Sequence, residues 1–488
     1  MWDAHTGTSM TPDNSSPRLN RRTYVKGLSV ALAAGIAGCL GDDGDGDGDD
    51  TGGDDGSIDR QSLDFWLFGG IPAEREYISS HYDNYGEHDV SYQHQEWGQK
   101  FEIIASAAAN NNLPYVMAGQ NQQIPDYVDA GAIEPLDQPE FEDRLEDIKD
   151  NFIDVNHEVN TYEGLGDTDG ERLWGLPGGY ADLGPFIDIR TDYLEQTSFD
   201  RPPRNWDELI QIGEEMQEID GVSAAITAPG TDFGLTTGYF IGFVYANGGR
   251  YFDPETGEAT IDEPGFVEAV EVYERIADAG LFPAAIAEND HIASGRLLRE
   301  GESGIFITYS HANAVYQTLD ADQDWLDGEG HVVTRAPLPE DPSGQFDPKD
   351  LLLQNAQGHM LATGSGGDDE KQAAFDYIEW WSQPEQLAPW TYEAEHDVGI
   401  RGRVPTLESA FEDPSDLFES QFGDLLNLYE DNELFARASN FPSFPGIASV
   451  QSEINTSVLQ PVMLGEMTAE EACSDANSAV QEILDDNL

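Results

Sequence analysis

The residue whose surroundings specify chemistry most clearly is Cys39, which ends a short apolar stretch near the N-terminus. The stretch, residues 27–38, follows the pair Arg21-Arg22. At about 1.5 Å per helical residue it spans roughly 18 Å, too short for a bilayer core of about 30 Å. Paired arginines before such a stretch are typical of a twin-arginine export signal, and Ile36-Ala37-Gly38-Cys39 resembles a lipobox. We therefore expect residues 1–39 to be a signal peptide and Cys39 to carry a lipid, although it could also be an ordinary small residue of the apolar stretch.

Aromatic and amide side chains at the ends of two predicted strands form a second set that could do chemistry. Trp66, Phe68 and Gly69 end the first strand, and Gln120 and Asn121 follow a later one. Flat aromatic rings cover apolar faces of a ligand, and short polar groups hydrogen-bond to its polar atoms, so this set suits non-covalent binding. The alternative is structural, because Trp66 and Phe68, two residues apart on a strand, could line one buried face of a sheet.

The elements that position these residues alternate between strand and helix. We expect strands near residues 62–68, 90–94 and 115–117, with helices near 74–84 and 99–110. A β-α-β-α-β order predicts a parallel sheet, and ligand-binding groups gather at the carboxyl ends of such strands.

The charge of the chain excludes several classes of partner. There are 95 acidic and 23 basic residues, a net charge of −72. Such a field repels nucleic acid and anionic lipid. Nine Trp, 19 Tyr and 22 Phe argue against disorder. The composition resembles that of proteins from halophilic archaea. At the high salt concentrations in which these live, the Debye length is about 3 Å, so repulsion between surface carboxylates is largely screened.

Residues 40–57, which follow Cys39, consist largely of Asp and Gly and predict an extended tether. Asp43, Asp45 and Asp47 come close to the spacing of a calcium-binding EF-hand loop, but neither flank is helical and the twelfth position is Asp, so chance explains the match better.

Catalytic and metal-binding motifs are missing from the sequence. It has no nucleophile elbow, phosphate-binding loop or HExxH motif, and no Cys/His cluster with metal-ligand spacing. We therefore expect no enzyme activity and no cofactor. Cys473 lies in a predicted helix near the C-terminus and is expected to be a small core residue.

Segments further along the chain carry a resemblance to a known family. Asn205-Trp206-Asp207-Glu208-Leu209, after Pro202-Pro203, resembles a helix start found in family 1 extracellular solute-binding proteins, the sugar-binding components of ABC importers. Other segments fall in that family's order: residues 173–177, 246–253, 281–283, 301–306, 336–339, 358–361, 373–385 and 402–406. The resemblance covers roughly residues 60–486, and it departs from the family pattern at residues 114–116 and 309–311.

The resemblance implies an α/β fold of two lobes, each a mainly parallel sheet flanked by helices, joined by crossover hinges around a ligand cleft. The expected boundaries are residues 58–180 with 356–405 for lobe one and 181–355 with 406–488 for lobe two. The further ligand-binding residues that it implies near the cleft are Tyr180, Asp182, Tyr239, Tyr309, His311, Gln357, Arg401 and Phe441. Each has a structural alternative: Tyr239, for example, lies in the apolar run 238–244 and could belong to the core of a helix.

The function that the resemblance implies is capture of a small solute, a sugar by preference, by cleft closure and its delivery to a membrane permease. The protein would be a monomer held by a lipid on the outer face of the cell membrane, with no nucleic-acid partner. Two alternatives stay open: an exported glycoside hydrolase, since 95 acidic residues make chance carboxylate pairs certain, and a structural cell-surface protein.

Overall fold

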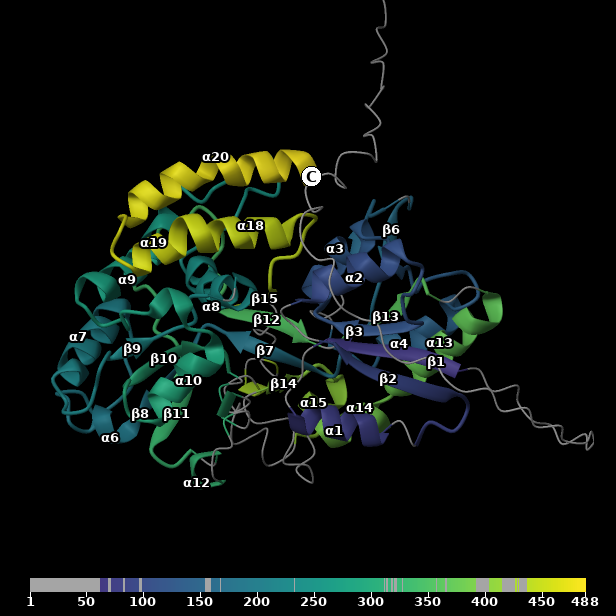
Figure 1. Cartoon of the computed structure of the whole chain (residues 1–488), viewed down its shortest axis with the longest axis horizontal. Coiled ribbons are helices and arrows are strands. Elements are labelled where there is room, and N and C mark those ends of the chain that lie inside the picture. Colours follow the sequence, from purple (N-terminus) through teal and green to yellow (C-terminus); the bar gives the residue numbers. More distant parts are fainter. Residues whose placement is uncertain are drawn as a thin grey trace, which may run out of the picture. The chain divides into compact units, whose positions relative to one another are not determined.

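The computed structural model describes residues 62–488 apart from 69–71, 82–83, 96–98, 154–158, 167, 232, 311, 313–314, 317–318, 320–322, 327, 357, 365–366, 392–402, 415–425, 428 and 430–436. All of these belong to the compact unit Ile58–Leu488 (Figure 1). The predictions for Cys39, the signal peptide and the tether lie outside the described residues, as do those for Gly69, His311, Gln357 and Arg401. Among the helices that are described, none has the length and apolar character needed to span a bilayer.

The first sheet contains the predicted β-α-β-α-β unit. Its strands are β1 (Ser62–Phe68), β2 (Asp89–Gln95), β3 (Val116–Gly119), β4 (Ile133–Glu134) and β13 (Gly358–Ala362), in the order β2-β1-β3-β13-β4. The strand β1 pairs in parallel with both β2 and β3, as predicted, because α1 (Pro72–His81) and α2 (Lys100–Ala109) carry the chain back between them.

The two faces of this sheet are buried against different helices. Leu63, Phe65 and Leu67 pack with residues of α4 (Glu142–Lys149) and α13 (Asp368–Trp381). Trp66 and Phe68 point to the opposite face and pack with residues of α2 and α3 (Ile124–Asp129). This is the period-2 alternation of a strand that is covered on both sides.

The second sheet is mostly antiparallel, which corrects the expectation of a mainly parallel sheet in each lobe. Its strands are β8 (Phe186–Arg190), β9 (Ile226–Thr227), β10 (Ile305–Thr308) and β11 (His331–Arg335), in the order β11-β8-β10-β9. Only β9 and β10 run parallel, whereas β8 is antiparallel to β10 and β11. In the first sheet β13 is likewise antiparallel to β3 and β4. Strands β8 and β13 each continue a crossover, so they enter their sheets from the opposite end.

Helices from the middle and the end of the chain bury this second sheet. They include α6 (Thr191–Leu194), α7 (Trp206–Gln217), α8 (Phe233–Ala246), α9 (Pro264–Asp278), α10 (His291–Arg299), α18 (Ile447–Ile454), α19 (Gln460–Met463) and α20 (Ala469–Asn487). The helix α7 begins at the motif, as the resemblance implies, and Asn205 caps it by accepting a hydrogen bond from the Glu208 N–H. Cys473 is buried in α20, which confirms the prediction that it is a core residue.

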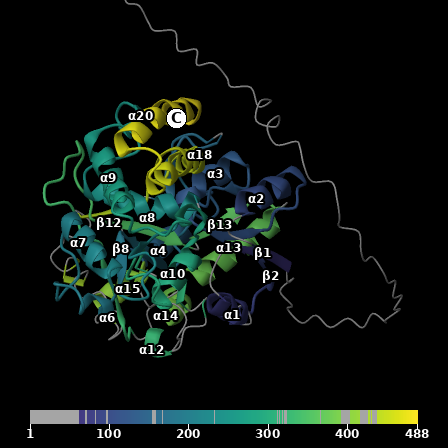
Figure 2. The same cartoon turned by 60° about the vertical axis from the view of Figure 1, so that its left-hand side comes forward.

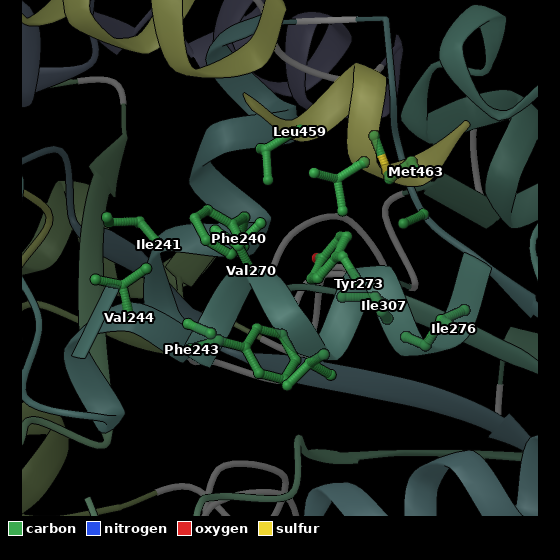
Figure 3. Packing of buried hydrophobic residues seen from close by; sticks show 14 of the residues in the cluster. Phe240, Ile241, Phe243, Val244, Val270, Tyr273, Ile276, Ile307, Leu459 and Met463 are labelled. Atoms are coloured by element: carbon green, nitrogen blue, oxygen red, sulfur yellow. The ribbon is translucent and has the colours of Figure 1, made fainter. Parts of the chain in front are cut away.

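Residues of α8 and α9 form the centre of this core (Figure 3). Phe240, Phe243 and Val244 of α8 meet Tyr273 of α9, and Leu459 closes the cluster from the C-terminal segment. The C-terminal helices α18 and α20 lie against each other in both views of the molecule (Figures 1 and 2).

A third sheet joins the other two. It consists of β14 (Arg403–Pro405), β7 (Tyr180–Gly184), β12 (Leu351–Ala356) and β15 (Ala438–Asn440), in that order. The strand β7 leads into β8 of the second sheet across the cis Gly184-Pro185 bond, and β12 leads into β13 of the first sheet. The remaining strands of the described residues, β5 (Thr161–Glu163) and β6 (Glu171–Leu173), form a separate hairpin. Two neighbouring strands therefore connect the two lobes, as hinge segments must.

Candidate ligand-binding site

Three of the predicted aromatic residues are brought together next to the joining sheet. Tyr309 directly follows β10, and its ring lies 4.4 Å from that of Tyr239 on α8, tilted by 39°. Phe441 directly follows β15 and approaches the same turn of α8 at Gly238. All three side chains are almost fully buried. Three segments that are far apart in the chain thus form one aromatic cluster.

Hydrogen bonds hold Tyr309 against the hinge strand β7. The next residue, Ser310, donates its backbone N–H to the carbonyl of Leu183 (2.8 Å) and accepts the Leu183 N–H at its hydroxyl (3.0 Å). Gly184 and Gly238 flank the ring, because a Cβ on Gly184 would lie 2.6 Å from Tyr309 Cε1 and one on Gly238 would overlap its hydroxyl. Burial raises the pKa of Tyr309 well above its usual value, so the hydroxyl stays neutral.

Asp182 of β7 forms a buried ion pair with Arg403 of β14. The two residues are register partners, and Arg403 Nε donates to Asp182 Oδ1 at 3.3 Å. Burial raises the pKa of Asp182 and lowers that of Arg403, since each charge has lost water. The attraction between the charges opposes both shifts. Asp182 lies on β7 two residues before Gly184, which the Tyr309 ring approaches. A buried ion pair is expensive to place for stability alone, so its position on this strand favours a functional role.

Asn121 has a positioning role in this structure. It is fully buried, and its amide Nδ2 donates to the carbonyl of Leu176 (3.2 Å) and to Asn160 Oδ1. A Cβ on Gly358 would overlap the same amide, so β13 fits only with glycine there. Asn121 therefore fixes the approach to the first crossover, while the preceding Gln120 is half-buried at the end of β3.

Trp66 and Phe68 do not join the aromatic cluster around Tyr309. They lie on the face of the first sheet that α2 covers, with their rings 6.4 Å apart and edge to face. Phe68 is 1% exposed, and Trp66, at 7%, lines an open groove of about 400 Å³ with Gln95 and Asn110. Their burial agrees with the structural alternative stated for this pair.

The remaining predicted residue is Tyr180, the first residue of β7, whose backbone pairs with Ala356 and Pro405. Sequence reasoning did not place Arg403 beside Asp182. The scarcity of basic residues marks any arginine as notable, but the pairing depends on the register of β14 against β7, which no local pattern specifies.

Taken together, two lobes on separate sheets, two connecting strands and a cluster of aromatic and polar groups beside them define a two-lobed binding protein. Comparison with known proteins agrees. Residues 82–420, more than half of the chain, match the bacterial extracellular solute-binding protein family, so this chain belongs to that family.

Solved structures share the fold over most of the chain. The maltose-bound MalE3 protein of T. maritima is 18% identical, with a TM-score of 0.68 and coverage of 86% of this chain and 99% of its own. A solute-binding protein of Thermotoga lettingae bound to α-D-tagatose is 20% identical, with a TM-score of 0.69 and coverage of 87% and 100%. A ribitol complex from Agrobacterium radiobacter is 15% identical, with a TM-score of 0.66 and coverage of 87% and 99%.

Relatives found by sequence match a smaller part of the chain than the solved structures do. A protein of Brucella abortus (strain 2308), named only as a binding protein, is 24% identical over 210 residues, which is 43% of this chain. The match spans about half (47%) of the length of that relative, and the same holds for a protein of Brucella suis.

Proposed function

We propose that the protein is the extracellular substrate-binding component of an ABC importer and that it captures a sugar by closure of its two lobes. The observation that carries this proposal is the aromatic cluster of Tyr239, Tyr309 and Phe441, which approaches Gly184 of the strand β7 that also carries the Asp182–Arg403 pair. Aromatic faces and hydrogen-bonding groups together are what sugar recognition needs. The solved relatives named above, bound to maltose, tagatose and ribitol, support the same class of ligand.

The mechanism that we propose is a shift between open and closed states. Tyr239 and Tyr309 are each 1% exposed, so the proposal requires that separation of the lobes around β7 and β12 opens a path for the ligand to reach them. A ligand that contacts both lobes only after closure stabilises the closed state by that difference in contacts. The closed form would then dock on the permease, and no chemical step on the solute is required.

The finer parts of the proposal concern how the protein is anchored and divided. We propose export by the twin-arginine route, a lipid on Cys39, a flexible Asp/Gly tether and a monomeric body adapted to high salt. We also propose lobe boundaries near residues 180, 355 and 405 and membership of the family 1 branch. The signal pattern, the charge of −72 and the motifs already described support these points.

A thermal-shift screen tests the function. The compact unit 58–488 in molar KCl is heated with sugars and polyols, and a ligand at 100 times its dissociation constant adds about 2.7 kcal/mol of stability. The expected result is a hit without turnover, and a smaller shift in a Tyr309→Phe variant. A Trp206→Phe variant is the control, because Trp206 packs on the lobe surface and donates to the Pro337 carbonyl (3.0 Å). Product formation would favour a hydrolase, and a hit among peptides or anions alone would overturn the sugar assignment.

A further inference from the structure

Three side chains with metal-ligand chemistry meet at the end of the first sheet that lies opposite the carboxyl ends of β1 and β3. Glu87 and His88 directly precede β2, and Asp376 comes from α13. One ligand atom from each of the three lies within 4.8 Å of the others. We propose that Glu87, His88 and Asp376 bind a divalent transition-metal ion such as Zn²⁺, which ties the loop before β2 to α13.

The spacing of the ligand atoms suits a shared ion better than a direct bond. His88 Nε2 lies 3.8 Å from Asp376 Oδ2, beyond the usual hydrogen-bond range of about 2.7–3.2 Å. Zinc binds imidazole nitrogen and carboxylate oxygen at about 2.0–2.2 Å, so two ligands of one ion lie up to about 4 Å apart.

Neighbouring side chains orient the Asp376 carboxylate. Its Oδ1 accepts hydrogen bonds from Arg144 (2.8 Å) and from Gln372 (2.6 Å). Oδ2 is thereby turned toward His88. Hydrogen bonds of this kind to a ligating carboxylate are typical of metal sites, where they fix the geometry of the ligand.

The charge of the cluster matches a divalent cation. Arg144 also pairs with Glu379, so the group holds three carboxylates, Glu87, Asp376 and Glu379, against one guanidinium. With His88 neutral the sum is −2. One divalent ion would balance it.

A buried tyrosine lies next to His88. Tyr85 is 5% exposed, and its hydroxyl has no hydrogen-bond partner among the described residues. Its ring centroid lies 6.0 Å from that of His88. A water molecule on the ion would donate to this hydroxyl, which otherwise costs free energy to bury.

The ligand types select the class of ion. Calcium and magnesium prefer all-oxygen sites, whereas an imidazole with two carboxylates suits zinc and its first-row neighbours. The site differs from the proposed sugar site in place and in chemistry, so either could fail without the other.

Calorimetric titration of the full chain with Zn²⁺ tests the proposal. Excess Mg²⁺ and molar KCl occupy the many surface carboxylates during the measurement. The expected result is one Zn²⁺ per chain, with affinity reduced on the order of tenfold or more in Glu87→Gln and in His88→Gln variants. His94→Gln is the matched control, because His94 is half-buried on the adjacent β2 and contacts Arg75 instead. Its zinc affinity should equal that of the wild type.

Two results would overturn the proposal: no saturable zinc binding, or wild-type affinity in the Glu87→Gln and His88→Gln variants. Glu87 is exposed, so its substitution leaves the fold intact, and it decides the question alone if the His88 variant is unstable without zinc.

Discussion

His359 is a histidine buried in an apolar environment at the start of β13. It is 2% exposed, and neither ring nitrogen has a hydrogen-bond partner among the described residues. Its ring stacks on Phe65 at 5.6 Å and tilts against Trp381 at 5.2 Å. Burial lowers the pKa of His359 to about 3, so the folded protein holds this ring neutral.

The depressed pKa of His359 predicts that acid destabilises the fold through this residue. The unfolded chain binds a proton near pH 6.5 and the folded chain does not, so the contribution to stability is present above pH 6.5 and is lost as pH falls below it. Between pH 7.5 and pH 4.5, the free energy of unfolding should fall by about 2.7 kcal/mol less in a His359→Leu variant than in the wild type. The figure follows from about 1.36 kcal/mol for each pH unit below the pKa of the unfolded histidine. Denaturant unfolding of both proteins at the two pH values measures the difference.

Any packing loss in the His359→Leu variant is the same at both pH values and cancels in this comparison. Equal acid sensitivity of the two proteins would show that His359 is already protonated, or hydrogen-bonded, in the fold.

At the scale of elements, Tyr309 depends on two glycines that belong to different elements. Gly184 ends β7 and Gly238 lies on α8, and both leave room for the same ring. In most helices a glycine costs up to about 1 kcal/mol relative to alanine. The glycine at 238 is therefore explained by the close approach of Tyr309 and not by helix propensity.

This packing predicts a coupled pair of substitutions. Gly238→Ala should destabilise the fold by about 1–3 kcal/mol, because its Cβ overlaps the Tyr309 hydroxyl. Adding Tyr309→Phe removes that hydroxyl and should recover part of the loss, which gives a favourable coupling energy. Thermal or denaturant unfolding of the two single variants and the double variant measures the coupling. Simple additivity would mean that Tyr309 moves away and that the aromatic cluster is not rigid.

At the scale of the whole molecule, the net charge of −72 predicts a strong dependence of stability on salt. The Debye length falls from about 10 Å at 0.1 M to about 3 Å at 1 M, which screens repulsion between surface carboxylates. The unfolding midpoint should rise steeply with KCl over this range, while affinity for a neutral sugar should change little. Trimethylamine N-oxide at matched osmolality is the control, since it does not screen charge and is not a sugar. A flat response to KCl would contradict adaptation to high salt.

Much of the first lobe could be predicted from local patterns. The strand over residues 62–68, the helix after it and the parallel β-α-β-α-β order follow from short apolar runs that are separated by helical stretches. The cap at Asn205 and the core position of Cys473 were likewise predictable, because capping and helix periodicity act over only a few residues.

Local patterns in the chain were therefore enough to predict the alternation of strands and helices, the family resemblance and the acidic surface. Three features became known only from the folded chain: Trp66 and Phe68 face a helix, β8 and β13 run antiparallel to neighbouring strands, and Asp182 pairs with Arg403. The proximity of His88 and Asp376 could not be predicted from the sequence either. The physical reason is distance along the chain: Asp182 and Arg403 are brought together by strand register and lobe packing, which are properties of the whole fold and leave no mark on nearby residues.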